Sequence, residues 1–280
     1  MIRQIVAAAL LAGTVVSVSA QQRELRAPAA PDAVVSITSD NADVRITGYD
    51  GDEVVVRVRT GSIRDVQLTG DRARLRIRNN DDEDLDVRVP RRARVDVHSQ
   101  NGDLSVSEVT GSVYLESLNG DARISGDARL VEVESVSGDI DVLGRVASIK
   151  ANTVSGDITL PRAIGVVDAS TTSGDIAVTA EGLERGNFSS TSGTVTFQGE
   201  PARNAALYFD SASGTIELRM RRDFAGDFDI STVSGDIDND MGPQPTRMRY
   251  GAGMYLRFNT GAGARVKASS VSGSVRLINP

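Results

Sequence analysis

The chain has 280 residues, a formal net charge of −7 at pH 7, no cysteine and no tryptophan. The acidic balance argues against nucleic acid as a partner, because phosphates require a basic surface. A single histidine without cysteine excludes the usual zinc ligand sets, and we expect neither a cofactor nor a metal. Nearly all of the positive charge is arginine interspersed with acidic residues, which predicts a mixed solvated surface and not a basic patch.

Residues 1–20 have the pattern of a cleaved signal peptide. Arg3 gives a positive start, residues 5–18 are apolar, and small residues end the segment at Ala20. The apolar stretch is too short to cross about 30 Å of hydrocarbon as a helix, so we expect no transmembrane segment in the mature chain. Residues 21–32 are polar with alanine and proline and are expected to form a linker. The sequence thus predicts an exported protein that is periplasmic, secreted or located at the cell surface.

Residues 33–280 form one predicted β-strand-repeat domain, in which Ser-Gly-Asp or a close variant recurs. The first four steps between the motif glycines are eighteen residues each, the next three are nineteen to twenty-one, and the last is thirty-eight. The long step leaves room for a degenerate repeat and an insertion. Residues 33–98 are a degenerate N-terminal part, in which SDNADVRI at 39–46 resembles SQNGDLSV at 99–106, with Ala42 at the glycine position.

Apolar and polar residues alternate after each motif glycine, which is the signature of half-buried strands in an all-β chain. Two architectures fit: a β-solenoid whose coils stack about 4.8 Å apart, and an antiparallel meander or sandwich built from hairpins. The solenoid is favoured because whole columns repeat in residue type, and stacking brings identical positions together. It predicts two buried columns, one of Ile140, Ile158 and Ile176 and one of Val142, Leu160 and Val178.

Five successive repeats carry an aspartate after the motif glycine. In a solenoid these carboxylates would lie about 4.8 Å apart and repel one another. Hydrogen bonds to turn N–H groups would offset the repulsion, as would calcium ions between the coils. The glycine-rich signature of calcium-binding β-rolls is missing, and later repeats replace Asp by Thr or Ser, which favours the structural role. The predicted turn ladder comprises Gly102, Asp103, Gly120, Asp121, Gly138, Asp139, Gly156, Asp157, Gly174 and Asp175.

One long segment, residues 238–265, departs from the repeat and concentrates methionine, aromatic residues and arginine. These residue types are enriched at binding surfaces, but a cap over the end of the repeats would need the same apolar residues. The cap interpretation is favoured, and the segment remains the best candidate for binding a partner. The candidate partner-binding residues are Arg247, Arg249, Tyr250, Tyr255, Arg257 and Phe258.

No catalytic site is expected. His98 is the single histidine, and neither a nucleophile elbow nor a cysteine accompanies it, so a surface histidine at a strand end is the simpler interpretation. Because some β-solenoids degrade polysaccharides, a polysaccharide lyase or glycosidase is the main enzymatic alternative. Paired acids occur throughout the chain and therefore do not mark an active site.

The segments SDNADVRITGYDGDEVVVRV and LDVRVPRRARVDVHSQNGDLSV, followed by serial SVSGDI units, resemble the bacterial β-strand-repeat family labelled "putative adhesin", a domain of unknown function. The resemblance covers roughly residues 33–280 and implies an envelope or extracellular repeat domain without catalytic residues to carry over. We therefore expect a non-catalytic, adhesin-like or envelope-associated binding or scaffold module whose partner is an unknown envelope or extracellular component. An envelope-stress sensor component is a further alternative.

Overall fold

The computed structural model describes residues 17–18, 24–80, 82–249 and 251–279. The expected signal peptide and the start of the linker lie outside this range, apart from residues 17–18. Contacts divide the chain into two compact units, Met1–Ser137 and Gly138–Pro280, which we describe in turn. The described residues form strands with one 3₁₀ turn, η1 (Ile63–Asp65), and none of them forms a helix long and apolar enough to span a membrane.

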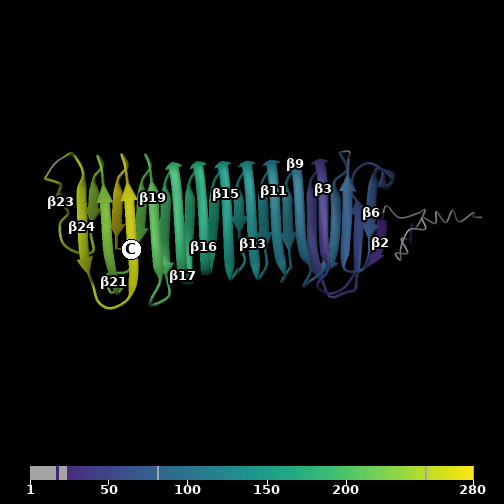
Figure 1. Cartoon of the computed structure of the whole chain (residues 1–280), viewed down its shortest axis with the longest axis horizontal. Helices are drawn as coiled ribbons and strands as arrows, with labels where there is room; N and C mark the ends of the chain where they lie inside the picture. The colour runs from purple at the N-terminus through teal and green to yellow at the C-terminus, as the bar shows by residue number, and fades with distance from the viewer. Residues whose placement is uncertain (1–16, 19–23, 81, 250, 280) are drawn as a thin grey trace, which may run out of the picture. The chain divides into compact units, whose positions relative to one another are not determined.

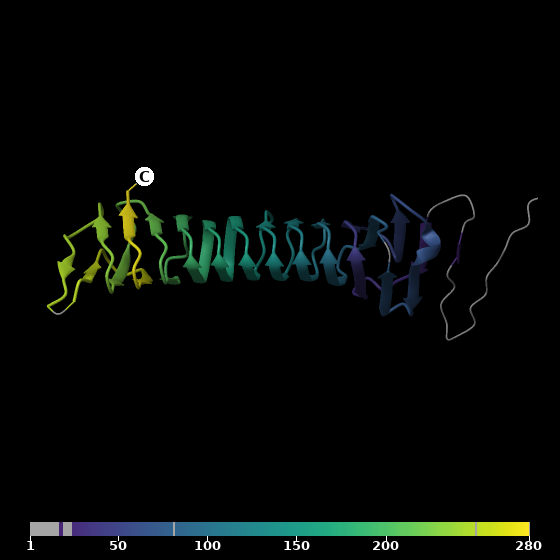
Figure 2. The ribbon, with the colours of Figure 1, turned by 90° about the horizontal axis from the view of Figure 1, so that it is seen from above.

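The first unit consists of two ladders of strands, to which each coil contributes one long and one short strand (Figures 1 and 2). In spatial order, the long-strand ladder contains β6 (Val66–Gly70), β7 (Arg74–Asn79), β3 (Val34–Asn41), β9 (Arg94–Asn101), β11 (Ser112–Asn119) and β13 (Leu130–Ser137). The second ladder contains β1 (Ser17–Val18), β2 (Glu24–Pro28), β5 (Glu53–Val58), β8 (Leu85–Pro90), β4 (Val44–Tyr49), β10 (Leu104–Ser107) and β12 (Ala122–Ser125).

The first coil of the chain lies inside the stack of this unit. Strands β3 and β4 are flanked on one side by β7 and β8 and on the other by β9 and β10, all in parallel pairing. The resemblance between residues 39–46 and 99–106 therefore marks direct neighbours, with Asn41 paired with Asn101 and Val44 with Leu104. Beyond the outermost coil, β6 pairs antiparallel with β7, and β5 pairs antiparallel with β8.

The second unit repeats this design. Its long-strand ladder contains β15 (Ser148–Ser155), β16 (Ile158–Ser173), β17 (Ile176–Ser192), β19 (Ala206–Ser211), β25 (Ala264–Ser270), β21 (Gly226–Thr232), β24 (Met254–Asn259) and β23 (Thr246–Arg247). The second ladder contains β14 (Ile140–Val142), β16, β17, β18 (Val195–Glu200), β20 (Ile216–Arg219), β26 (Val275–Ile278) and β22 (Ile237–Asn239). Strands β16 and β17 are long enough to take part in both ladders.

The last coil of the chain also lies inside its stack. Strand β25 pairs with β19 on one side and β21 on the other, and β26 lies likewise between β20 and β22. The thirty-eight-residue step leaves room for a degenerate repeat and an insertion, and the structure has the antiparallel hairpin β23–β24 at this place. The sequence pattern does not distinguish the two, because an antiparallel strand and a parallel coil strand share the same period-two alternation.

The parallel pairing of successive coils confirms the β-solenoid and excludes the antiparallel meander as the main architecture. Ile158 pairs in register with both Ile140 and Ile176, and all three side chains are fully buried. Leu160 pairs with Val178, and both of these side chains are buried, as is that of Val142. The predicted isoleucine column is thereby confirmed, and the core of each unit is a stack of such columns between the two ladders.

Candidate functional site

The motif turn joins the long strand of each coil to the short strand. Its first residue, a serine or threonine, points into the protein and is buried, and in Thr171 the hydroxyl donates to the carbonyl of Gly156 at 3.2 Å. The glycine allows the turns to stack closely, since a Cβ on Gly102 would lie 2.4 Å from the carbonyl oxygen of Ala42. The φ of Gly102 is +109°, a conformation that other residues rarely adopt. The motif thus combines a buried hydroxyl with a glycine that both the close stacking and the backbone conformation require.

The motif aspartates form a hydrogen-bonded ladder within each unit. In the first unit, Oδ1 of Asp103 accepts the backbone N–H of Asp121 at 3.0 Å. In the second unit, Oδ1 of Asp139 accepts from Asp157 at 2.8 Å, and Oδ1 of Asp157 accepts from Asp175 at 2.8 Å. The repeat that replaces Asp by Thr keeps the donor, because Thr194 N–H donates to Asp175 Oδ1 at 2.6 Å. Each carboxylate therefore binds the next coil and not its own turn.

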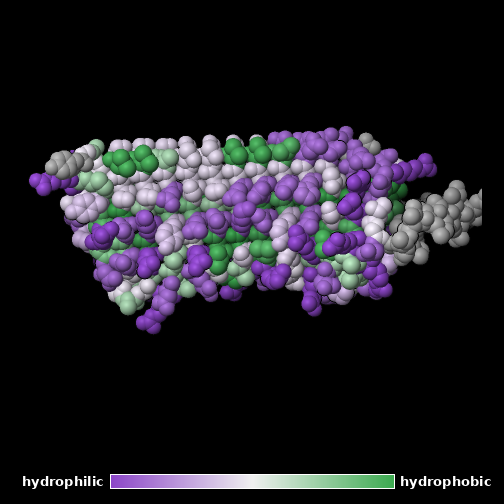
Figure 3. Space-filling view, viewed as in Figure 1, coloured by the Kyte–Doolittle hydropathy of each residue, from purple (hydrophilic) through white to green (hydrophobic). Residues whose placement is uncertain are grey.

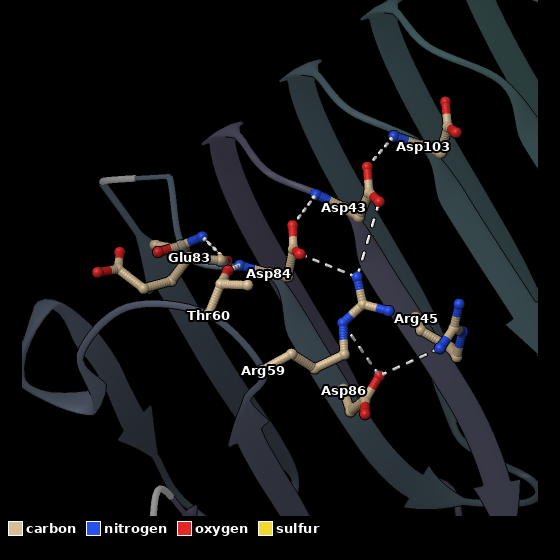
Figure 4. A network of polar contacts seen from close by, with 9 residues as sticks. Asp43, Arg45, Arg59, Thr60, Glu83, Asp84, Asp86 and Asp103 are labelled. Carbon is tan, nitrogen blue, oxygen red and sulfur yellow. Dashed lines mark hydrogen bonds and ion pairs between the residues drawn. The ribbon is translucent and has the colours of Figure 1, made fainter.

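In the first unit the aspartate ladder ends beside an arginine, Arg59, and Figure 4 shows the aspartates at this end. Asp103 donates its N–H to Asp43 Oδ1 at 3.0 Å, and Asp43 donates to Asp84 Oδ1 at 3.2 Å. The guanidinium of Arg59 lies 2.9 Å from Asp84 Oδ2 and 3.7 Å from Asp43 Oδ2 (Figure 4). This positive charge offsets the repulsion between neighbouring carboxylates. Within the described residues, no group of three or more His, Asp or Glu side chains is arranged to hold a metal ion.

Sequence reasoning did not assign Asp43, Asp84 or Arg59 to this ladder. The signal for Asp43 was present, because it lies in the segment SDNADVRI that resembles a motif turn. Asp84 is the last residue of the acidic turn at residues 79–84, whose composition indicates only a solvated loop. Arg59 comes from the end of β5, a strand outside the repeat, so its approach depends on the antiparallel pairing of β5 with β8.

The candidate partner-binding segment forms the end of the long-strand ladder in the second unit. Strand β24 pairs antiparallel with β21, and its residues alternate between two faces. Leu256 is 3% exposed, and the ring of Phe258 stacks on that of Phe228 with centroids 4.5 Å apart. Tyr255 and Arg257 face outward, and their exposed fractions are 46% and 72%. One face of β24 therefore covers the core while the other faces solvent.

The six candidate residues do not all share the outer face of β24. Arg257 forms an ion pair with Asp229 at 2.8 Å, and Tyr255 lies beside Ser231. Arg247 is exposed in β23, opposite Met254, and Arg249 follows in the turn of the hairpin. Tyr250 lies outside the described residues. The structure thus brings Tyr255 and Arg257 together on the outside and places Phe258 against the core.

His98 lies on the outer face of the first unit, in a shallow pocket of about 250 Å³. Its Nδ1 is 2.7 Å from Glu116 Oε2, and the guanidinium of Arg94 lies over the ring of Tyr114, 4.1 Å from its centroid. Further carboxylates on the pocket wall belong to Asp96, Glu132 and Glu134. Ser99 follows His98 in the chain, but strand alternation turns its side chain into the protein. The histidine is thus paired with a carboxylate and not with a serine nucleophile.

In several motif turns of both units, the residue directly after the buried serine or threonine is an exposed aliphatic residue. This feature was not predicted from the sequence. In Figure 3 hydrophobic side chains appear along the edge where the long strands end. In the first unit they are Leu118 and Val136, and in the second unit Val154, Val233 and Val271, with exposed fractions of 45–62%. The signal lies in the second position of the motif, as in SVSGD and TVSGD.

Comparisons with known proteins place the fold in a family. No curated protein matches the chain. A solved structure described as a "putative adhesin" from Bacteroides fragilis aligns with 93% of this chain and 98% of its own, at 12% identity and a TM-score of 0.46. A "putative cell adhesion protein" from Clostridium sporogenes aligns with 93% and 100%, at 7% identity and a TM-score of 0.22. The family profile described as Toastrack DUF4097 matches residues 13–163 and 167–278, and since this is most of the chain, the protein belongs to the Toastrack DUF4097 family.

Proposed function

We propose that this protein is a non-catalytic, exported binding module, adhesin-like or otherwise associated with the cell envelope, that holds its partner on the outer face of β24. The observation that carries the proposal is the exposed pair Tyr255 and Arg257 on a strand whose opposite face is fixed in the core. Tyrosine and arginine often dominate the binding energy of an interface. A strand anchored by Leu256 and Phe258 holds both side chains in place at little cost in conformational entropy when a partner binds.

The aspartates support a structural and not a catalytic role. The motif carboxylates accept backbone N–H groups from neighbouring coils, so one oxygen of each of these regularly spaced acids is bound to the backbone. A catalytic acid or base must instead be free to exchange a proton with a substrate. The regular coils therefore provide a rigid scaffold that presents the outer face of β24.

Quantitative capture of envelope components tests the proposed surface. We expect Tyr255→Ala and Arg257→Ala to reduce the capture of the parent's principal envelope partner at least about tenfold, because truncating an anchor residue typically costs about 2 kcal/mol or more. The melting temperature should change little, since both side chains face solvent. The matched control is Arg203→Ala, which removes an exposed arginine elsewhere in the same unit. Full capture by both β24 variants would refute the assignment of this face.

Export is the second part of the proposal. The support is the sequence of residues 1–20, with Arg3, an apolar stretch and small residues before Gln21. Cleavage after Ala20 would remove β1, while β2 would keep its pairing with β5. Intact-mass measurement of the protein from periplasmic and culture fractions should give a chain that begins at Gln21. Recovery of only the uncleaved form from these fractions would contradict cleavage at this position.

A carbohydrate-active enzyme is the second candidate, because the shallow pocket around His98 combines acids with arginine and tyrosine. Glycosidases and lyases use such groups to protonate or deprotonate a sugar polymer. Incubation with a panel of polysaccharides, followed by assays of reducing ends and unsaturated products, decides between the two functions. Product formation that Glu134→Gln and His98→Gln abolish would establish the enzyme and displace the binding module. Equal signals from parent and variants would leave the pocket without a catalytic role.

A further inference from the structure

Strand β7 of the first unit carries a row of arginines on one face. Arg74, Arg76 and Arg78 alternate with the buried Leu75 and Ile77, so the three guanidinium groups lie on the exposed side. Within the part of the chain that the structure describes, none of the three forms an ion pair. The sequence predicted a mixed surface without a basic patch. That prediction was wrong here because acids and arginines that alternate along the chain need not share a face of the sheet. Strand alternation places all three arginines of β7 on one face, while the acids nearest in the chain lie outside the strand.

Neutral hydrogen-bonding side chains flank the row on both neighbouring strands. In register, Arg76 lies between Ser36 of β3 and Thr69 of β6. Arg78 lies between Thr38 and Gln67 in the same manner. Arg76 and Arg78 thus each have one neutral polar side chain on either side. The two arginine positions are about 7 Å apart along the strand.

Three other arginines of the same unit lie close to acids. Arg94 is 2.9 Å from Asp96 on β9, and Arg57 is 2.8 Å from Glu24. Arg59 is 2.9 Å from Asp84. These partners neutralise the arginines locally, whereas Arg76 and Arg78 of β7 form no ion pair with any residue that the structure describes, and Asp71 lies near Arg74 alone. A ligand with negative charges would complete the row.

A shallow groove of about 510 Å³ runs beside the row. Its wall includes Ser36, Thr69, Arg74 and Arg76, together with one acid, Asp71. The carboxylate of Asp71 accepts the N–H groups of Arg74 at 2.9 Å and Ala73 at 2.8 Å, which hold its pKa below the usual value. This acid is therefore engaged with the turn that precedes β7, and it lies at one end of the row. The groove adjoins Arg74 and Arg76, and Arg78 lies exposed further along the same side of β7.

We propose that the arginine row of β7 binds a linear anionic polysaccharide, with successive sulfate or carboxylate groups on Arg76 and Arg78. The guanidinium fork binds such oxyanions with two hydrogen bonds, and the flanking hydroxyl and amide groups bind sugar hydroxyls. Strands β3, β6 and β7 carry no aromatic side chain on which nucleic-acid bases would stack. Their exposed faces also lack the large apolar residues with which a protein enters a membrane. This surface is independent of the outer face of β24.

Binding of a charged and an uncharged polymer to the purified protein tests the proposal. Dextran sulfate should bind and unmodified dextran should not, and affinity should fall as salt screens the charges. The variant Arg76→Gln/Arg78→Gln should weaken binding at least about tenfold, as expected from the loss of charge-assisted hydrogen bonds. The matched control is Arg45→Gln/Arg88→Gln, which removes the same charge from the exposed sides of β4 and β8. It should retain nearly full affinity.

A second variant guards against misfolding of the first. Thr69→Glu would place a carboxylate beside Arg76 and compete with the polymer, and we expect a similar loss of affinity with an unchanged melting temperature. Equal losses in the row variant and its control would reduce the effect to net charge and overturn the proposal, as would the absence of dextran sulfate binding. Tighter binding of single-stranded DNA or of anionic lipid vesicles than of dextran sulfate would overturn the assignment of a polysaccharide.

Discussion

At the scale of single residues, a motif aspartate accepts hydrogen bonds both through its side chain and through its backbone carbonyl. Oδ1 of Asp157 accepts the N–H of Asp175 in the following coil at 2.8 Å, and its carbonyl accepts the N–H of Ile140 in the preceding coil at 2.8 Å. A row of carboxylates is tolerated because each one is satisfied by a backbone donor and faces solvent. The ladder therefore links the coils chemically along an edge where no apolar side chain could do so.

The ladder predicts a difference between two substitutions of Asp157. Asp157→Ala removes the acceptor for Asp175 N–H and should lower the free energy of unfolding by about 1 kcal/mol. Asp157→Asn keeps an oxygen acceptor and removes a like charge, so its stability should equal or exceed that of the parent. Denaturant titration measures both, with Asp168→Ala, an exposed aspartate outside the ladder, as control. A melting temperature that rises strongly with millimolar calcium and collapses in Asp157→Asn would instead indicate an ion ladder.

Glu24 gives the second prediction at this scale. Its side chain is 4% exposed and forms ion pairs with Arg57 at 2.8 Å and with Arg26. Burial raises the pKa of Glu24, but the hydrogen bond from Arg57 and the charge of Arg26 outweigh this and hold the pKa below its usual value of 4.5. A depressed pKa means that the ionised side chain stabilises the fold above about pH 4.5 and loses this effect as the pH falls through the folded-state pKa.

We expect Glu24→Gln to lose about 1–3 kcal/mol at pH 7, because two charge-assisted contacts disappear. The variant should also show a smaller decline than the parent when the pH falls from 7 to 3. Unfolding titrations at several pH values measure both effects. Parallel pH profiles for parent and variant would show that Glu24 does not contribute to the acid sensitivity of the protein.

At the scale of elements, identical residues stack because the coils repeat in register. Ile140, Ile158 and Ile176 occupy equivalent positions of β14, β16 and β17 and exclude water from the space between the two ladders. In the second unit, Phe188 and Phe209 extend the same principle to aromatic rings, which stack with centroids 5.2 Å apart. Burial of these columns supplies the hydrophobic stabilisation that disulfides cannot provide in a chain without cysteine.

The isoleucine column predicts a large effect for a charge at its centre. Ile158→Asp should cost several kcal/mol, because an unpaired carboxylate would be buried between two isoleucines. Ile158→Val, which removes one methylene group, should cost only about 0.5–1.5 kcal/mol. Chemical denaturation at neutral pH distinguishes the two. A melting temperature for Ile158→Asp within a degree or two of the parent would contradict the burial of this position.

At the scale of the whole molecule, each unit ends in strands that break the parallel pattern. In the first unit β5 and β6 pair antiparallel with the outermost coil, and in the second unit β24 does so. An uncovered parallel strand would expose unpaired N–H and C=O groups to other chains. In the first unit β5 and β6 therefore protect the outermost strand of each ladder from pairing with other molecules, and in the second unit β24 does so for β21 and covers Phe228 with Phe258.

Removal of the cap should cause association. We would replace residues 240–263 with a copy of residues 143–147, the short connection between β14 and β15. The free edge of β21 and the uncovered Phe228 should then produce concentration-dependent oligomers and lower stability. Light scattering after size exclusion measures the mass, and Tyr255→Ala, which keeps the cap, serves as control. A shortened protein with the parent's mass at all concentrations would show that β24 is not needed to protect the edge.

The sequence by itself determined the repeat, the all-β class and the residues that share a column, because period-two alternation and an eighteen-residue step fix which side chains meet in a stack. It also identified residues 39–46 as an equivalent of a motif turn. In the candidate site, composition alone identified the segment of β24. Which of its residues face outward followed from the alternation only once the partner strand was known.

Only the tertiary structure decided the order of the end coils. The repeats are so alike that any of them could stack on any other. The sequence therefore does not show on which side of its predecessor in the chain a coil stacks. The antiparallel strands decide this: with β5 and β6 covering β8 and β7, the coil of β9 and β10 stacks on the other side of β3 and β4. Tertiary pairing likewise brought Arg59 to the aspartate ladder and left the arginines of β7 without acids among their in-register neighbours, since both depend on contacts between strands far apart in the chain.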